Sequence, residues 1–269
     1  MSTKAESPGP SAPRRPAGRR SHRPAFFFWP ALLFALVFPS LLSWTDFVLL
    51  AGGTGVPPGG GAANPAQQAA YGVGKVIQFA WPVVCFWLLE GRLPRPARPT
   101  GRGLEWGLAF GLLVVAGMLV LYYVFLRGTS VFAATALQLR QKLEEYDVAS
   151  PGGFALFAGF VTVPHALLEE YYWRWFVFGQ LRQRLPLAVA IAVSSLGFMA
   201  HHVIILHVFF PGQFLAAVVP FSLCVAAGGA AWAWLYERTN SIWAAWLSHL
   251  LVDAGLFVVG YDLFFVQKG

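Results

Sequence analysis

The sequence from residue 153 to residue 178 reads GFALFAGFVTVPHALLEEYYWRWFVF, an apolar and aromatic run that contains the adjacent carboxylates Glu169 and Glu170. As an α-helix, a run of this length crosses about 30 Å of hydrocarbon at about 1.5 Å per residue. A charged side chain at the centre of a bilayer is unfavourable by at least about 2.5 kcal/mol on insertion scales. The run therefore predicts a membrane-spanning helix whose two carboxylates have a structural or a chemical role.

Apolar runs of similar length recur along the rest of the chain. Hydrophobic residues make up 57% of the sequence and charged residues only 12%, which is too little polar surface for a water-soluble globule of this size. We expect seven spans, at residues 26–50, 71–90, 104–126, 153–178, 187–208, 214–236 and 241–260. The sequence thus predicts an all-α fold, a polytopic transmembrane helical bundle of about seven spans.

The segments outside these runs differ in composition. Residues 1–24 are rich in Pro, Ser, Gly and Arg and cannot bury an apolar face, so we expect a disordered basic cytoplasmic tail and a single transmembrane domain over residues 25–269. Residues 52–68 form an uncharged connector rich in Gly and Pro. Residues 134–147 are amphipathic, which predicts a helix along the membrane surface. Asp46 and Asp262 lie near outer helix ends, where we expect them to be solvated.

The Lys and Arg residues are distributed unevenly between the two sides of the predicted bundle. With the tail in the cytoplasm, that side receives the tail cations together with Arg92, Arg95, Arg98, Arg102, Arg174, Arg182, Arg184 and Arg238. The other side holds Lys75, Arg127, Arg140, Lys142 and Lys268. This imbalance predicts a cytoplasmic N-terminus in the cell (plasma) membrane. The net charge of +7 is explained by orientation in a lipid bilayer, so we expect no nucleic acid partner.

Polar residues inside the later spans fall at helical spacing. The fourth span carries Glu169, Glu170 and Arg174, the fifth carries His201 and His202, and the seventh carries His249 and Asp253. Residues four apart lie on one face of a helix, so Glu170 can pair with Arg174, and His249 and Asp253 point the same way. Counting along the helices at about 1.5 Å per residue places these groups in one layer. We expect them to line a polar cavity formed by the later helices.

Three motifs occur in order on these helices: EEYYWR from Glu169 to Arg174, FMAHH from Phe198 to His202, and HLLVD from His249 to Asp253. Over about residues 150–260 the chain resembles the CPBP family (CAAX protease and bacteriocin-processing) of intramembrane proteases, the Rce1-like group. The resemblance implies a hydrolase that cuts a membrane-anchored or transmembrane protein or peptide, in a helical bundle whose polar cavity opens toward the cytosol.

The resemblance also implies roles for the motif residues. Peptide hydrolysis needs a base for water, donors for the oxyanion and an acid for the leaving amine. Glu169 would activate water, His202 would help to position it, and His249 with Asp253 would stabilise the tetrahedral intermediate. Glu170 and Arg174 would form a supporting pair, and Phe198 would support by packing. Asp253 departs from the pattern, since many members carry Asn there.

These residue types could activate water either with a bound metal ion or without one. Glu169, His202, His249 and Asp253 could surround Zn²⁺ at about 2.0 to 2.2 Å. A catalytic zinc site usually leaves a separate carboxylate as the base, and here Arg174 would hold Glu170. We therefore expect no cofactor and a glutamate-dependent rather than a metalloprotease mechanism.

Other interpretations remain beside this one. The Glu pair could be a structural ion pair, and His202, His249 and Asp253 could make only interhelical hydrogen bonds. For His201, which falls outside the motif spacing, and for His165, a structural role is favoured. A non-catalytic membrane scaffold or immunity protein on the same fold is an alternative, as is a proton-coupled transporter. The substrate, the cleavage site and the oligomeric state stay open.

Overall fold

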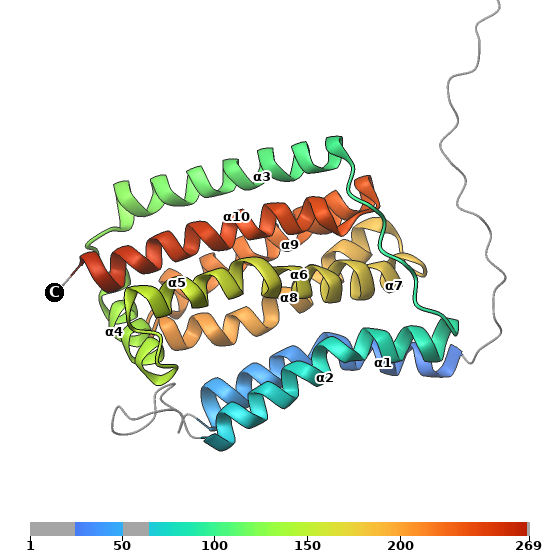
Figure 1. Cartoon of the computed structure of the whole chain (residues 1–269), viewed down its shortest axis with the longest axis horizontal. Coiled ribbons are helices and arrows are strands. Elements are labelled where there is room, and N and C mark those ends of the chain that lie inside the picture. Colours follow the sequence, from blue (N-terminus) through green and yellow to red (C-terminus); the bar gives the residue numbers. More distant parts are fainter. Residues whose placement is uncertain (1–24, 51–64, 268–269) are drawn as a thin grey trace, which may run out of the picture.

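The structure of the chain, a computed structural model, describes residues 25–50 and 65–267. The predicted tail at residues 1–24 lies outside the described residues, as does most of the connector after the first span. Within the described residues the protein is a helical bundle without strands, as predicted (Figure 1).

Seven helices are long and apolar enough to cross a membrane, which confirms the predicted number of spans. In chain order the spans are α1 (Ala25–Trp44) with η1 (Thr45–Leu49); α2 (Pro65–Glu90); α3 (Gly101–Val120) with η2 (Leu121–Leu126); α5 (Pro151–Phe160), η3 (Val161–His165), α6 (Ala166–Glu170), η4 (Tyr171–Phe178) and α7 (Gly179–Arg182); α8 (Leu187–Phe209); η5 (Phe214–Val218) with α9 (Val219–Thr239); and α10 (Ile242–Tyr261) with η6 (Asp262–Val266). The η segments are π-helical turns that continue their neighbours.

Residues with side-chain oxygens set the first turn of several spans. The hydroxyls of Thr100, Ser150 and Ser241 accept hydrogen bonds from backbone N–H groups in the first turns of α3, α5 and α10. Each bond satisfies a backbone donor that has no partner within the helix. Asn240, with φ of 51°, ends α9 in the left-handed conformation that Asn tolerates. The helix starts at 101 and 242 therefore fall close to the predicted ones.

The second span starts six residues earlier than predicted. We predicted residue 71, but α2 begins at Pro65 and includes the end of the predicted connector. Proline fits the first turn of a helix because its missing N–H has no partner there. Gln67 is 1% exposed and its amide donates to the backbone oxygen and to Oδ1 of Asp46. Lys75, which we placed at the outer side, consequently lies about 15 Å along the helix from its first residue.

The two ends of the bundle are defined here by the helices that meet there. At the N-terminal face α1 begins, α2 ends, and the extended segment 91–100 crosses to α3 (right in Figure 1). At the α4 face the helix α4 (Ser130–Glu145) connects α3 to α5 (left in Figure 1). The predicted amphipathic helix is therefore present and begins before residue 134.

Asp46 and Asp262 contradict the expectation that they are solvated, since their exposed fractions are 2% and 5%. Asp262 is bound by the Arg127 guanidinium at 2.9 Å and by the Tyr122 hydroxyl at 2.8 Å. Asp46 accepts from Gln67. Both carboxylates are buried because partners on neighbouring helices replace water.

Glycines let α3 pack closely on α10, the helix that carries His249. Gly103, Gly107 and Gly111 are buried at a spacing of four. A Cβ atom at Gly107 would lie 2.3 Å from the backbone oxygen of Ala244, and one at Gly111 would lie 3.1 Å from Cα of Ser248. No side chain fits at this helix contact, so glycine is needed there.

The fourth span occupies the middle of the bundle over its second half. The side chains from Tyr172 to Phe178 in η4 are all buried, and all but Arg174 belong to a hydrophobic cluster with residues of α1, α2, α8 and α9. Its first half is more open, since Leu156 is 79% exposed. Glu169 and Glu170 lie where the open half meets the buried half, in the bundle interior.

Candidate active site

Glu169 lies on α6, a short α-helical stretch between the π-helical segments η3 and η4. Pro164 in η3 has no backbone N–H and cannot complete an ordinary helical hydrogen bond, which accounts for a wider turn before Glu169. The Glu169 side chain is buried, with 4% of the residue exposed. A carboxylate in this position needs polar partners from other helices.

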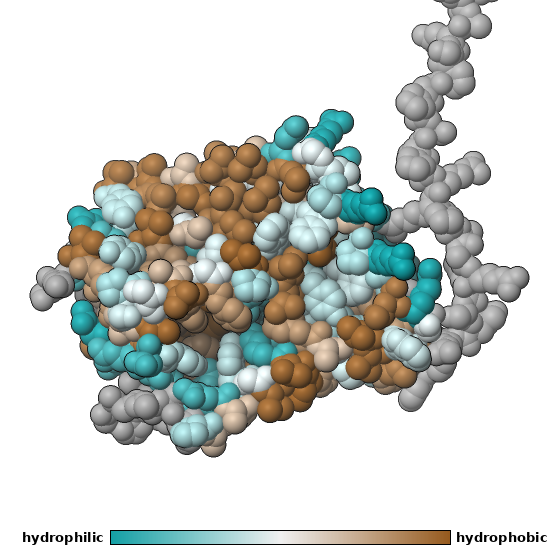
Figure 2. All heavy atoms as spheres, viewed as in Figure 1, coloured by the Kyte–Doolittle hydropathy of each residue, from teal (hydrophilic) through white to brown (hydrophobic). Residues whose placement is uncertain are grey.

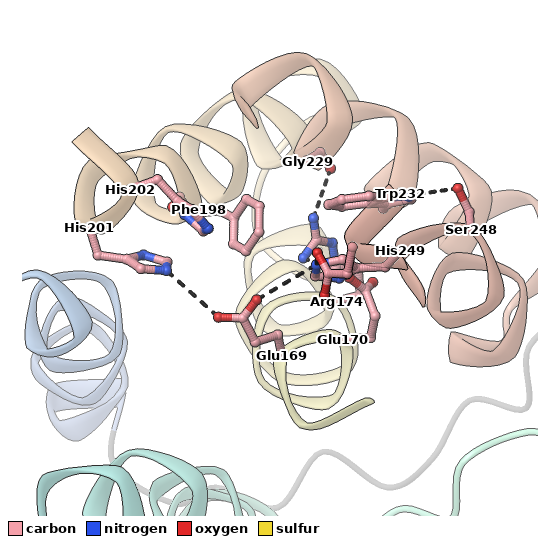
Figure 3. A network of polar contacts seen from close by, with 11 residues as sticks. Glu169, Glu170, Arg174, Phe198, His201, His202, Gly229, Trp232, Ser248 and His249 are labelled. Carbon is pink, nitrogen blue, oxygen red and sulfur yellow. Dashed lines mark hydrogen bonds and ion pairs between the residues drawn. The ribbon is translucent and has the colours of Figure 1, made fainter. Parts of the chain in front are cut away.

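Two imidazoles from different helices supply those partners (Figure 3). The Nε2 atom of His201 on α8 is 3.7 Å from Oε1 of Glu169. The Nε2 atom of His249 on α10 is 3.8 Å from Oε2. Each carboxylate oxygen therefore faces one ring nitrogen, with separations that exceed direct hydrogen bonds.

Glu170, the second carboxylate, is fully buried and already paired. Its Oε1 atom is 3.1 Å from Nη1 of Arg174 and accepts a hydrogen bond of 2.8 Å from Nδ1 of His249. Because a carboxylate accepts, His249 carries a proton on Nδ1, which leaves Nε2 directed at Glu169. The predicted Glu170–Arg174 pair is present and also orients the imidazole of His249.

Aromatic rings hold Arg174 and His249 in place. The Arg174 guanidinium lies 4.6 Å from the Phe198 ring and 5.0 Å from the Trp232 ring, positions that favour cation–π attraction. Trp232 stacks on the His249 ring at 4.1 Å, and its Nε1 donates to the hydroxyl of Ser248. Sequence reasoning did not single out Trp232 or Ser248. The available signal was a tryptophan inside the sixth span rather than at its end.

His202 occupies a different place from the predicted one. Its Nδ1 donates to the backbone oxygen of Phe198 at 2.9 Å, and its ring lies 4.6 Å from the Phe198 ring. Neighbouring helix residues point about 100° apart, so His201 and His202 cannot face Glu169 equally. His201 contacts Glu169 directly, and His202 lies behind it with ring centroids 4.2 Å apart. The motif spacing favoured a structural role for His201, whereas the structure places its ring against Glu169.

Asp253 follows His249 by one turn of α10. Its Oδ1 atom is 3.6 Å from Nε2 of His249. The same imidazole nitrogen therefore faces Asp253 and Glu169. The structure brings together Glu169, Glu170, Arg174, His249 and Asp253, as predicted. His201 joins them through Glu169. His202 contacts Phe198, which in turn lies against Arg174.

The described side chains of the site are not arranged to hold a metal ion. Within residues 25–50 and 65–267, no group of three or more His, Cys, Asp and Glu side chains is arranged to hold one. The set Glu169, His202, His249 and Asp253 does not converge on one point, because His202 is turned toward Phe198.

Two cavities open at the N-terminal face, with volumes of about 230 and 190 Å³. Trp175, Tyr236 and Asn240 line both, together with parts of segment 91–100. Glu169 and the site histidines line neither cavity. Trp175 lies six residues after Glu169 on the same span, so these cavities approach the site from the N-terminal face without reaching it.

The arrangement is suited to hydrolysis. A buried carboxylate can take a proton from water, and two imidazoles beside it can donate to an oxyanion or to a leaving amine. The buried Glu170–Arg174 pair fixes one of these imidazoles, so its reacting nitrogen is held in one direction.

Comparison with known families gives a match for the part of the chain that carries the site. Residues 151–255 match the family model described as type II CAAX prenyl endopeptidase Rce1-like. No curated protein and no solved structure matches the chain. The matched region contains every residue of the site described above and is consistent with the CPBP family, as the motifs predicted.

Proposed function

We propose that this integral membrane protein is an intramembrane endopeptidase of the CAAX type. It would hydrolyse a peptide bond in a membrane-anchored or transmembrane protein. The observation that carries the proposal is the position of Glu169 between His201 and His249, inside the Rce1-like domain at residues 151–255.

In this proposal Glu169 is the general base. It takes a proton from a water molecule, and the resulting hydroxide attacks the carbonyl carbon of the scissile bond. The C–N bond then breaks, and a proton passes to the leaving amine, so that an acid and an amine are formed. His249, whose Nδ1–H is held by Glu170 at 2.8 Å, would act as the imidazolium and donate the second proton, on Nε2, in a hydrogen bond to the oxyanion. His201 and His202 would position the water, and Asp253 would orient His249.

We further propose that the reaction needs no metal. Support comes from Glu170, whose Oε1 atom is bound by both Arg174 and His249. If Glu169 were a zinc ligand, this occupied carboxylate would be the neighbouring candidate base. Metal analysis of active, tag-free protein should therefore find much less than one zinc per chain. About one zinc per chain, with activity lost on chelation and restored by zinc, would show instead that a metal acts.

The proposed location is the plasma membrane, with the N-terminal face in the cytoplasm. Support comes from the exposed cations at that face, Arg92, Arg95, Arg98 and Arg102, because positive residues favour the cytoplasmic side. Hydrophilic residues gather at both ends of the molecule in Figure 2, so the sign of the charge rather than polarity alone distinguishes the two faces.

The function is tested with purified protein in liposomes and a library of quenched, membrane-anchored fluorescent peptides. We expect cleavage of some peptides by the wild type and none above background by Glu169→Gln, whose side chain keeps its shape but cannot act as a base. Thermal unfolding of both proteins controls for folding. Equal cleavage by the two proteins contradicts the proposed base, and absence of cleavage across the library favours a non-catalytic scaffold on the same fold.

A further inference from the structure

Lys75 is a cation inside the second membrane-spanning helix. The helix extends from Pro65 to Glu90, so Lys75 lies well away from both ends. A lysine at such a depth is costly unless its ammonium has a counterion or reaches water. Long side chains near helix ends can extend to the interface, but from this position the distance is about 15 Å along the helix.

No counterion is in place for Lys75. Within the part of the chain that the structure describes, its ammonium makes neither an ion pair nor a hydrogen bond. Its contacts are the rings of Tyr71 at 5.4 Å and Phe79 at 5.6 Å, both on the same helix. Cation–π attraction of this kind supplies about 0.5 to 2 kcal/mol, which is less than a desolvated ammonium requires. The site is therefore electrostatically incomplete.

Lys75 faces the helix that carries Glu169. It lies one turn before Phe79, and residues four apart share a helix face. Phe79 packs its ring edge-on against His165 and Tyr172, with centroids 6.2 Å apart in each pair. The Tyr171 hydroxyl donates to the backbone oxygen of Phe79. Lys75 is thus on the α2 face that packs against the fourth span.

Two carboxylates, those of Glu169 and Asp46, interact electrostatically with Lys75 without forming an ion pair with it. His165 interacts electrostatically with both Lys75 and Glu169. Oδ1 of Asp46 accepts a hydrogen bond from Gln67, and the two oxygens of Glu169 face His201 and His249 at 3.7 and 3.8 Å. Lys75 therefore interacts electrostatically with the proposed base and with a structural carboxylate, but forms an ion pair with neither.

The surface next to α2 is hollowed. Figure 2 shows a recess between α4, α5 and the α1–α2 pair, on the open half of the fourth span, where Leu156 and Phe160 are exposed. A ligand entering from the bilayer at this recess would meet α2 and α5, the first part of the span that carries Glu169.

We propose that Lys75 determines specificity: its ammonium binds a carboxylate of the substrate beside Glu169. The carboxylate could be the C-terminus of the peptide or an acidic side chain near the scissile bond, since both offer the same counterion. The ligand would supply the charge that the protein leaves open. This inference rests on the proposed function, because it takes the ligand to be the substrate on which Glu169 acts.

The test measures binding separately from hydrolysis. One lipid-anchored fluorescent peptide that the wild type binds is made in four forms: with a free C-terminus or a C-terminal amide, and with Glu or Gln beside the scissile bond. Their affinities are measured by fluorescence anisotropy in nanodiscs, with Glu169→Gln as the background to prevent turnover. Lys75→Met removes the charge at similar length, Lys75→Arg keeps it, and Val76→Met, at a position that is 69% exposed, is the matched control.

We expect Lys75→Met to weaken binding of the peptides that carry one of the two carboxylates, either the free C-terminus or the Glu side chain. The loss should be about 10- to 100-fold, as for loss of a charge-assisted hydrogen bond. Peptides in which that carboxylate is replaced by an amide should bind the protein with Lys75 and the Lys75→Met variant equally within about twofold. The form that discriminates identifies the carboxylate as terminal or side-chain. Lys75→Arg should keep most of the discrimination, and Val76→Met all of it.

Equal weakening of all four peptides by Lys75→Met, or no discrimination by the protein with Lys75, overturns the assignment. Unfolding temperatures of the variants separate this outcome from misfolding, and Lys75→Arg tests the charge in a protein that retains it. Discrimination without cleavage by the wild type would refute the proposed function and leave the Lys75 site standing. Cleavage by the wild type with equal binding of the carboxylate and amide peptides would support the proposed function and refute the Lys75 site.

Discussion

At the scale of single residues, the site depends on which groups each carboxylate contacts. Glu169 and Glu170 are adjacent in the chain, yet they point to different partners. Glu170 is committed to Arg174 and to Nδ1 of His249, whereas Glu169 faces two imidazole nitrogens at 3.7 and 3.8 Å. The longer separations leave Glu169 able to accept a proton, and the shorter ones make Glu170 a positioning residue.

The two neighbouring histidines of α8 can be compared directly. We expect His201→Ala and His202→Ala each to lower kcat by at least about tenfold, since an acid/base or water-positioning group contributes up to about 10²- to 10⁴-fold. His207→Ala, an exposed position later on the same helix, should leave kcat unchanged. Peptide cleavage in liposomes measures all three. A wild-type rate in His201→Ala would show that its contact with Glu169 is structural.

The Arg174 ion pair should matter mainly for folding. Removing one partner of a buried pair leaves an unpaired charge, which destabilises by about 3 to 5 kcal/mol, so Arg174→Ala should lower both abundance and unfolding temperature. Arg182, which pairs with Glu237 at the N-terminal face and is 35% exposed in its side chain, is the control. Arg182→Ala should change stability by less than about 1 kcal/mol. Equal effects of the two substitutions on thermal unfolding would contradict the structural role of Arg174.

At the scale of helices, α3 sets the position of α10 and hence of His249. The contact is made by glycines, and Gly111 lies against Ser248, the residue before His249. A helix outside the matched region of residues 151–255 therefore supports the site from behind.

Gly111→Leu tests this contact. The added side chain cannot fit without moving α10, and overpacking of this kind is unfavourable by about 1 to 3 kcal/mol. We expect a lower unfolding temperature and, because His249 is displaced, a lower kcat. Gly117→Leu on the same helix, where nothing lies within 4 Å of the added Cβ, should change neither. If Gly117→Leu is as damaging as Gly111→Leu, close packing of α3 against α10 does not explain the loss, since leucine favours a helix more than glycine does.

At the scale of the whole molecule, the bundle has two unlike ends. Segment 91–100 with its arginines crosses the N-terminal face, and α4 covers the opposite one. The seven spans place these two segments on opposite sides of a membrane, so their accessibility reports the orientation.

Cysteine labelling measures that orientation. In a background with Cys85 and Cys224 replaced, we expect Glu144→Cys on α4 to react with a membrane-impermeant reagent in intact cells. Pro96→Cys in segment 91–100 should react only after permeabilisation, because positive residues favour the cytoplasmic side. Both positions are exposed, so burial does not account for a difference. The reverse pattern would invert the proposed topology.

The sequence by itself determined the features that depend on local periodicity. Apolar runs of spanning length predicted the seven helices, and residues four apart predicted the contacts of Glu170 with Arg174 and of His249 with Asp253. These contacts lie within one helix, where spacing alone places side chains on the same face. The three motifs likewise identified the Rce1-like region without knowledge of the packing.

Only the tertiary structure decided the relations between helices. It selected His201 rather than His202 to face Glu169, because the rotation of α8 against the fourth span is set by packing. It buried Asp46 and Asp262, whose partners Gln67, Tyr122 and Arg127 are distant in the chain. It also extended α2 to Pro65, where Gln67 contacts Asp46. Lys75 therefore lies well inside the second span, on the face of α2 that packs against the fourth span. Each of these results depends on a partner from another helix, and the period of a single helix carries no information about that partner.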